Sequence, residues 1–159
     1  MSRTAESEMK KYSAVIIGGG NIAGSHARGY AAIDEIDIVA VADPDRDKAA
    51  GFSKQFGIHS VYGDYRDMLD KERPDIVSIC TWHPFHAEMT VAAASRKPQV
   101  ILCEKPMATS IGEAEEMIIA CDRNEVKLAV GFQRRFLSAW TKARELILSL
   151  IHISEPTRR

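Results

Sequence analysis

The chain has 159 residues, the length of a single domain, and its 45% hydrophobic and 27% charged residues are typical of a globular protein rather than a disordered one. Its 21 basic and 22 acidic residues give a net charge of -1, so we expect no nucleic acid partner, because phosphate binding needs a clustered basic excess. No apolar run approaches the ~18 residues of a membrane span or the ~7–15 of a secretory signal, which predicts a cytoplasmic protein without membrane association.

Short apolar runs alternate with helix-length segments, which is typical of a parallel α/β sheet with right-handed crossovers. Apolar runs that are continuous rather than alternating predict strands buried on both faces. The predicted strands are Ala14–Ile17, Ile38–Val41, Ile76–Cys80 and Val100–Leu102, with weaker candidates at 61–62 and 127–130. The predicted helices are Ile22–Ala32, Arg46–Gln55, Pro84–Ala94 and Ser110–Asn124. The chain thus predicts an α/β fold of Rossmann type, a doubly wound parallel sheet in three layers.

Local signals mark where the predicted helices begin. Asp45 is placed to cap the second helix, and Pro84 occupies a first-turn position where its missing N–H costs nothing. Ser110 and Glu113 fit a capping box, in which each side chain satisfies a backbone donor of the other. The last helix is then expected to bury one apolar stripe, made of Ile111, Ala114, Ile118 and Cys121.

The chain contains three cysteines, Cys80, Cys103 and Cys121, and each stands in an apolar stretch. An odd number of cysteines in apolar sequence predicts reduced, buried thiols rather than disulfides, as is usual in the cytoplasm. The spacing provides no C-x-x-C pair, so we expect no metal site.

A glycine-rich turn joins the first predicted strand to the first predicted helix. Its sequence, Gly18-Gly19-Gly20-Asn21-Ile22-Ala23, fits the dinucleotide-binding pattern G-x-G-x-x-A. In this pattern Gly18 permits the tight turn, Gly20 lets a diphosphate approach bare backbone, and Ala23 keeps the helix close to the strand. The N–H groups of Asn21 and Ile22 are then expected to face the anion at the helix N-terminus.

Asp43 lies 20 residues beyond Ala23, at the end of the second predicted strand, where a ribose-binding acid is expected. The alternative for Asp43 is a simple Asx turn before Pro44. A carboxylate at the ribose repels a 2′-phosphate, so the sequence favours NAD as cofactor. NADP is not excluded, because Arg46 is close enough in sequence to accommodate that phosphate, although it also fits a solvated helix-surface charge.

Three further motifs follow the later predicted strands: Cys80-Thr81-Trp82-His83-Pro84-Phe85-His86, Cys103-Glu104-Lys105-Pro106 and Gly131-Phe132-Gln133-Arg134-Arg135-Phe136. Together with the glycine-rich turn they resemble the glucose-fructose oxidoreductase/inositol dehydrogenase (Gfo/Idh/MocA) family over about residues 11 to 148. Glu-Lys-Pro directly after a buried strand is the most specific of these elements. Trp82 stands where that family usually has proline.

The resemblance implies an oxidoreductase in which Lys105 is catalytic and lies where nicotinamide and substrate meet. It also implies that Thr81, His83 and His86 border the cofactor. The remaining cofactor-binding residues that it implies are Glu104, Lys105 and Arg135. All of these follow the carboxyl ends of predicted strands, which is the edge of an open α/β sheet where ligands bind.

Without the resemblance, the polar residues of these motifs have simpler interpretations. His83 and His86 fit cap and packing residues of the helix that starts near them. Arg134 and Arg135 fit a solvated pair of charges. Outside the motifs, His26 and His59 are expected on a helix surface and in a loop, without a functional role.

The chemical role of Lys105 stays open at this stage. Oxidation of an alcohol requires removal of the hydroxyl proton as hydride leaves, and a lysine with a lowered pKa can accept that proton. Glu104 beside it favours the charged lysine, which would instead polarise the substrate oxygen. The Lys105–Pro106 bond is a candidate for a cis peptide.

We expect a polar tail at residues 1–10, an NAD(P)-binding Rossmann domain at 11–131, a hinge with a first helix at 132–148 and an anomalous tail at 149–159. This last segment resembles translated sequencing-adapter sequence. The family resemblance implies a second α/β domain that carries a catalytic histidine in a D-x-x-x-H motif. That domain is missing here, so we expect a truncated chain. The resemblance further implies that full-length members are homo-oligomers.

Three functions fit these observations. The first is the nucleotide-binding part of an NAD(P)-dependent oxidoreductase that acts on a hydroxyl of a sugar, cyclitol or related cyclic polyol. The second is a dinucleotide-binding module or fragment without catalysis. The third is an S-adenosylmethionine-dependent methyltransferase, whose fold also has a glycine turn and an acidic ribose ligand but has no need of the Glu104-Lys105-Pro106 motif.

Overall fold

A six-stranded parallel sheet forms the centre of the protein, described here from a computed structural model at residues 11–149. The strands lie in the order β3-β2-β1-β4-β5-β6, and every neighbouring pair is parallel. The order reverses between β1 and β4, which is the switch point of a doubly wound sheet. The strands are β1 (Tyr12–Ile17), β2 (Ile36–Ala42), β3 (Ser60–Tyr62), β4 (Ile76–Ile79), β5 (Val100–Cys103) and β6 (Lys127–Val130).

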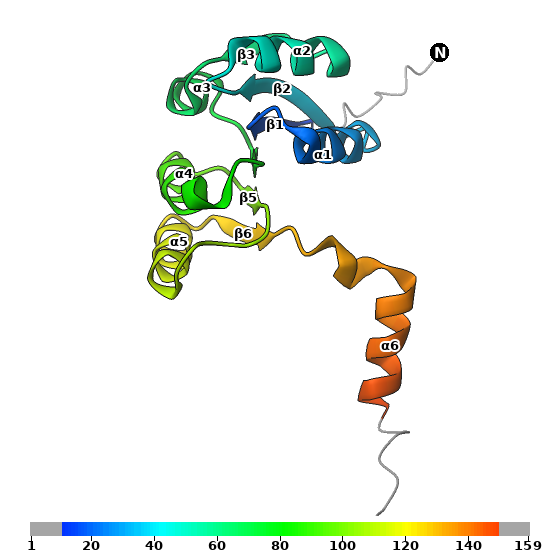
Figure 1. The fold of residues 1–159 in the computed structure, drawn as a ribbon. Coiled ribbons are helices and arrows are strands. Elements are labelled where there is room, and N and C mark those ends of the chain that lie inside the picture. The colour runs from blue at the N-terminus through cyan, green and yellow to red at the C-terminus, as the bar shows by residue number, and fades with distance from the viewer. Residues whose placement is uncertain (1–10, 150–159) are drawn as a thin grey trace, which may run out of the picture.

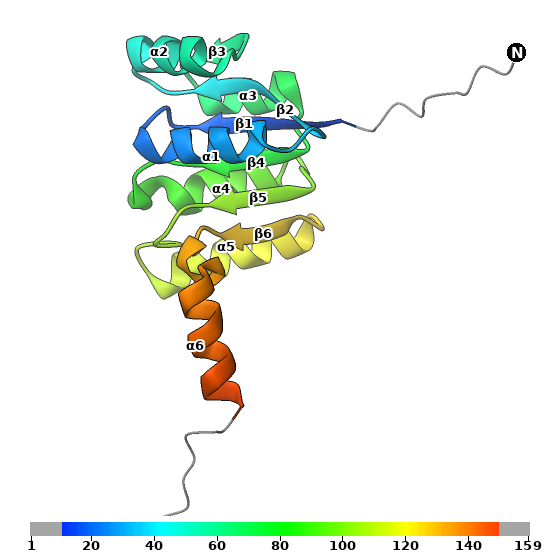
Figure 2. The ribbon, with the colours of Figure 1, turned by 90° about the vertical axis from the view of Figure 1, so that its right-hand side faces the viewer.

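Helices cover both faces of this sheet and give it three layers (Figures 1 and 2). One face carries α1 (Asn21–Ala31) and α2 (Arg46–Phe56). The opposite face carries α3 (Tyr65–Glu72), α4 (His86–Ala94) and α5 (Ile111–Arg123). The predicted fold class is therefore confirmed.

The core lies on both sides of the sheet because successive strand residues point to opposite faces. In β1, Val15 and Ile17 pack toward α3, α4 and α5, whereas Ile16 packs with Ala23 and Ala27 of α1. All of these side chains are buried. Burial on both faces is the physical reason that the strands are continuous apolar runs, and both the strong and the weaker predicted strands are present.

The helix α3 is not among the helices expected from the sequence. This helix has the polar sequence Tyr-Arg-Asp-Met-Leu-Asp-Lys-Glu and only eight residues, so it gives a weak helical pattern. Its signals are the Asp64 N-cap, whose side chain accepts the Arg66 N–H, and a short buried stripe of Tyr65, Met68 and Leu69. These side chains pack against β2 and cover the core on that face of the sheet.

Asp45 and Ser110 cap their helices as predicted, but the return contact of the capping box goes to Thr109, whose N–H donates to Glu113 Oε2 at 2.8 Å. The buried stripe of α5 is predicted only in part. The Asp45 side chain accepts the N–H groups of residues 47 and 48, and the Ser110 hydroxyl accepts that of residue 113 at 3.2 Å. Of the expected stripe, Cys121 is buried as predicted, but Ile111 is 79% exposed and Ile118 is 47% exposed. Met117, which was not in the stripe, packs with Cys121 in the core shared with α4.

The 3-10 turn at Gln133–Phe136 and α6 (Ser138–Leu148) leave the sheet after β6 and extend away from it (Figure 1). Three large apolar side chains of this turn and helix are exposed: Phe136, Trp140 and Leu146. None of the helices at residues 11–149 is long and apolar enough to cross a membrane. The expectations for residues 1–10 and for 150–159 of the anomalous tail lie outside the described residues.

The three cysteines are free thiols buried in the core, as predicted. Burial raises the pKa of the Cys103 thiol to about 12 and raises that of Cys80 further still. Because the thiolate is the reactive form, these cysteines are unreactive residues that pack in the core.

Candidate functional site

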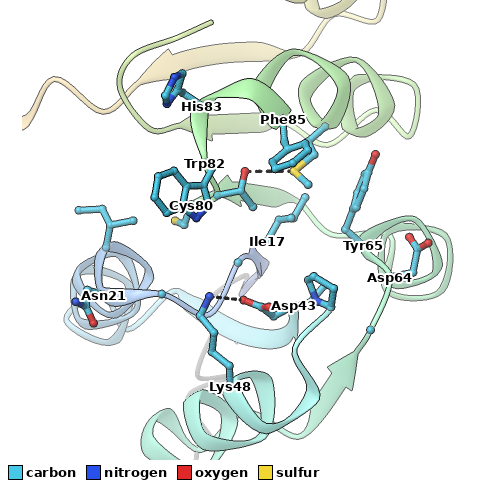
Figure 3. Close-up of a pocket in the computed structure, with 18 of the residues that line it drawn as sticks. Ile17, Asn21, Asp43, Lys48, Asp64, Tyr65, Cys80, Trp82, His83 and Phe85 are labelled. Carbon is cyan, nitrogen blue, oxygen red and sulfur yellow. Dashed lines mark hydrogen bonds and ion pairs between the residues drawn. The ribbon is translucent and has the colours of Figure 1, made fainter. Parts of the chain in front are cut away.

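A cavity of about 680 Å³ opens at the carboxyl edge of the sheet, at the switch point between β1 and β4 (Figure 3). Loops that follow β1, β2, β4 and β5 all contribute to its wall. Parallel strands end at one edge, so residues far apart in sequence meet there. The predicted site residues that line this cavity are Gly18, Gly20, Asn21, Ile22, Asp43, Thr81, His83 and Lys105.

The glycine-rich turn forms the floor of the cavity and needs glycine at its first position. Gly18 has φ +94°, and a Cβ there would lie 2.9 Å from the carbonyl oxygen of Cys80. Gly20 is the N-cap of α1, and it leaves the first turn of that helix without a side-chain cap. The amide donors at this end are therefore available to an anion. Ala23 lies behind the turn, where it packs on the sheet as predicted.

Asp43 follows β2 and faces the glycine-rich turn from the neighbouring strand. Its Oδ2 accepts the Gly19 N–H at 2.8 Å and lies 2.9 Å from Lys48 Nζ, while Oδ1 accepts the Asp45 N–H at 3.0 Å. Burial alone raises the pKa of Asp43, but these hydrogen bonds and the Lys48 charge outweigh it and hold the pKa below its ordinary value. The Asx-turn interpretation is confirmed, because Oδ1 accepts the Asp45 N–H, and the carboxylate also lines the cavity where the ribose-binding interpretation needs it.

The loop after β4 forms the opposite wall. Thr81, Trp82 and His83 line the cavity together with Phe85 of the 3-10 turn at His83–Phe85 (Figure 3). Trp82, which replaces the proline usual in the resembled family, is 77% exposed. Its indole therefore stands at the mouth of the cavity rather than in the core.

His86 does not line this cavity, and the packing interpretation describes its position. The side chain is 1% exposed, with Nδ1 2.9 Å from the Pro106 carbonyl oxygen and Nε2 3.1 Å from that of Thr81. It thereby connects the loop after β4 with the loop after β5. A neutral imidazole has one N–H, so it donates to one of these carbonyls at a time.

Glu104 and Lys105 follow β5 and point to different environments. Glu104 is buried, and its Oε2 accepts the Lys105 N–H at 3.1 Å, whereas the Lys105 side chain is exposed and lines the cavity. Gly131 packs so closely on Glu104 that a Cβ there would lie 2.7 Å from Oε1. The Lys105–Pro106 peptide is cis, as the sequence suggested.

The expectation that His26 lies on the helix surface is wrong. Its side chain is only 8% exposed, with Nε2 3.1 Å from Glu104 Oε1 and Nδ1 3.0 Å from Ser78 Oγ. The Tyr30 hydroxyl lies 2.6 Å from the same Ser78 oxygen, which completes a buried polar network under the site. A local signal existed, since His26 falls at helical spacing from the buried Ala23 and Tyr30 of α1.

Arg135 does not line the main cavity but a second one of about 450 Å³. Its guanidinium lies over the Phe132 ring at 5.7 Å from the centroid. Lys105 lines this cavity as well as the first, so it stands where the two meet. Across residues 11–149, no three His, Cys, Asp or Glu side chains are grouped so as to hold a metal ion.

Comparison with known proteins shows which family has this fold and these motifs. The family model of the oxidoreductase family with an NAD-binding Rossmann fold, Gfo/Idh/MocA, matches residues 12–132. The chain belongs to this family. The match spans the glycine-rich turn, Asp43 and the Glu104-Lys105 motif, and it removes the methyltransferase alternative, because the matched domain of the Gfo/Idh/MocA family binds NAD.

Two curated Gfo/Idh/MocA relatives are similar over most of this chain. D-apiose dehydrogenase from Paraburkholderia graminis is 33% identical over 122 residues, which are 77% of this chain and 32% of the relative. Myo-inositol 2-dehydrogenase from Thermotoga maritima is 29% identical over 132 residues, which are 83% of this chain and 39% of the relative. The chain therefore spans 32% to 39% of the length of these relatives.

A solved structure supports the same assignment. An oxidoreductase from Agrobacterium radiobacter, crystallised with NAD+, L-tartaric acid and magnesium, matches with a TM-score of 0.83 and 25% identity. The match covers 89% of this chain and 41% of the solved chain. The shared part is the parallel sheet with its flanking helices, which in this chain holds the cavity described above.

Proposed function

We propose that this chain is the nucleotide-binding part of an NAD(P)-dependent oxidoreductase that moves hydride between nicotinamide and a hydroxyl of a sugar, cyclitol or related cyclic polyol. The observation that carries the proposal is the meeting of the glycine-rich turn, Asp43 and Lys105 in one cavity. The named activities of the relatives, on D-apiose and on myo-inositol, support the substrate class.

The residues of the cavity fit a dinucleotide. At Gly20 a Cβ would meet only Lys48 Nζ, at 4.0 Å, so a diphosphate has room beside the uncapped start of α1. Asp43 is fixed by its backbone donors in a position to accept a ribose hydroxyl. On the other side of the cavity, Tyr65 and Phe85 offer aromatic surface to a base (Figure 3).

When bound, the nicotinamide supplies the hydride acceptor. Lys105 stands at the junction of the two cavities and either accepts the hydroxyl proton or donates a hydrogen bond to the substrate oxygen. We propose that Glu104 and His86 act indirectly, because Glu104 binds the Lys105 N–H and His86 holds the following Pro106 carbonyl. Thr81 and His83 border the cofactor, and Arg135 faces it from the second cavity.

We also propose that two segments of the chain have different roles. Residues 11–131 hold the dinucleotide, and residues 132–148 form a hinge and a helix that lead toward a substrate domain. The exposed apolar side chains of α6 support this, since they are suited to packing against further protein. We propose further that the full-length protein forms homo-oligomers. The free, buried cysteines support a cytoplasmic location.

Titration of the chain with NADH tests the proposal. The wild type should bind NADH, and Asp43→Ala should weaken binding by about tenfold because a ribose contact is lost. Lys105→Ala should change the affinity by less than about threefold, since Lys105 is proposed to act on the substrate. Intrinsic fluorescence quenching gives all three affinities, and circular dichroism verifies that each variant is folded.

Two outcomes would change the assignment. Equal NADH affinities for the wild type and Asp43→Ala would contradict the proposed ribose contact. The second outcome concerns a longer protein that also carries a substrate domain. If this protein binds NADH but forms no NADH from NAD+ and any cyclic polyol, a non-catalytic module is favoured.

A further inference from the structure

The Glu104 carboxylate lines neither of the two cavities that Lys105 lines, and both of its oxygens have partners. Oε2 accepts the Lys105 N–H at 3.1 Å, and Oε1 lies 3.1 Å from His26 Nε2. The two side chains that meet here are buried, with 8% of His26 and 7% of Glu104 exposed, so water does not compete for the contact. A buried carboxylate held at both oxygens fixes the backbone amide of the lysine that follows it.

Two hydroxyl groups behind His26 fix the orientation of its ring. Nδ1 lies 3.0 Å from Ser78 Oγ, and the Tyr30 hydroxyl lies 2.6 Å from the same oxygen. A carboxylate only accepts hydrogen bonds, so Nε2 of His26 carries the proton that is donated to Glu104. In the neutral ring Nδ1 then accepts from Ser78, whose oxygen accepts in turn from Tyr30. The ring therefore cannot turn over without losing the contacts at both of its nitrogens.

The first residue after β6 packs against the same carboxylate. A Cβ at Gly131 would lie 2.7 Å from Glu104 Oε1, which is the oxygen that meets His26. The Gly131 N–H donates to the Cys103 carbonyl at 2.8 Å, which holds the start of the hinge beside Glu104. The carboxylate thus contacts three parts of the chain: α1, the motif that contains Lys105, and the segment that leaves the sheet toward α6 (Figure 1).

We propose that His26 is a positioning residue for Lys105, and that the Glu104 carboxylate it holds couples Lys105 to the start of the hinge at Gly131. The inference rests on the role proposed for Lys105 and adds to it the buried group that fixes the backbone of this lysine. A carboxylate is planar and rigid, so a displacement of Oε1 by the hinge also moves Oε2 and the Lys105 amide. His26 opposes this movement from α1, and Lys105 keeps its place where the two cavities meet.

Two amide substitutions at His26 separate positioning from simple burial. His26→Gln keeps a donor near the position of Nε2 and so keeps the contact with Glu104, whereas His26→Asn is one carbon shorter and reaches only toward Ser78. In NMR spectra of the full chain, the Lys105 amide proton should move upfield in His26→Asn and stay in place in His26→Gln. Its hydrogen exchange should become faster by about tenfold or more in His26→Asn and change by less than about threefold in His26→Gln.

Gly131→Ala tests the coupling from the hinge. The new methyl group enters the space of Glu104 Oε1 and displaces the carboxylate, so the Lys105 amide should change as it does in His26→Asn. Gly112→Ala is the matched control, because a Cβ there meets nothing within 4 Å, and it should leave the Lys105 amide unchanged. The effects of His26→Asn and Gly131→Ala should be less than additive in the double variant, since both act through one carboxylate.

The inference is overturned if the Lys105 amide responds equally to His26→Asn and His26→Gln, or if Gly131→Ala leaves it unchanged. The ring nitrogens of His26 in the wild type give a measurement that does not depend on the folding of a variant. Their chemical shifts should show a proton on Nε2, and a ring protonated on Nδ1 alone would also overturn the inference. If the wild type binds no NADH while the Lys105 amide responds as expected, the proposed function fails and the positioning of Lys105 by His26 stands.

Discussion

Replacing Gly18 by alanine should destabilise the fold by about 3 kcal/mol and abolish NADH binding. The backbone at Gly18 has φ +94°, which a residue with a Cβ rarely adopts, and the new methyl group would lie 2.9 Å from the Cys80 carbonyl oxygen. That oxygen belongs to the backbone at the end of β4 and has no freedom to move away. Urea unfolding followed by circular dichroism measures the loss of stability.

Gly20→Ala is the matched control, because it adds the same methyl group two residues further on. Gly20 has φ -81°, and a Cβ there has open space around it apart from the flexible Lys48 side chain. Its unfolding curve should match that of the wild type, whereas its NADH affinity should fall by about tenfold as the methyl group meets the diphosphate. Equal stabilities of Gly18→Ala and Gly20→Ala would contradict the structural role given to Gly18.

Replacing His26 by alanine should lower the free energy of unfolding by roughly 3 kcal/mol, because it leaves buried polar groups without their partner. Glu104 loses the contact at 3.1 Å and Ser78 the contact at 3.0 Å, and both side chains lie out of reach of water. His26→Gln should recover part of the loss, since an amide can donate to one of the two. Urea unfolding of the three proteins gives the comparison.

His59→Ala serves as the control for a histidine without buried partners. His59 is exposed in the loop before β3, so its removal should change stability by less than about 0.5 kcal/mol. If His26→Ala is as stable as His59→Ala, the buried network does not support the site. If His26→Gln is no better than alanine, shape rather than hydrogen bonding explains the loss.

The sequence predicted the parts of the molecule whose signals are local. Continuous apolar runs indicated the strands because burial on both faces leaves no polar position in them. The acid at 43 could be located because the glycine-rich turn and the end of the next strand have a fixed spacing in this fold. The Asp45 cap was equally visible, since a cap and the amides that it binds are neighbours in sequence.

What the sequence did not predict depends on partners far along the chain. His26 and Glu104 are 78 positions apart, so the sequence does not reveal the partner of the histidine, although the helical spacing of His26 from Ala23 places it toward the buried face of α1. The exposed Ile111 and Ile118 follow from how α5 meets α4, which periodicity alone does not define. The contact between Asp43 and Lys48 is different, because the two residues are close in sequence and side-chain geometry decides which nearby cation meets the carboxylate.

Amide chemical shifts of the isotope-labelled chain, recorded during titration with NADH, test the central claim most directly. The account predicts that the largest shifts fall on the amides of Gly19, Gly20, Asn21 and Ile22, with a further shift at Asp43, because the diphosphate and the ribose lie there. Absence of shifts at saturating NADH, or shifts confined to the hinge and α6, would contradict the claim that this sheet edge holds the dinucleotide.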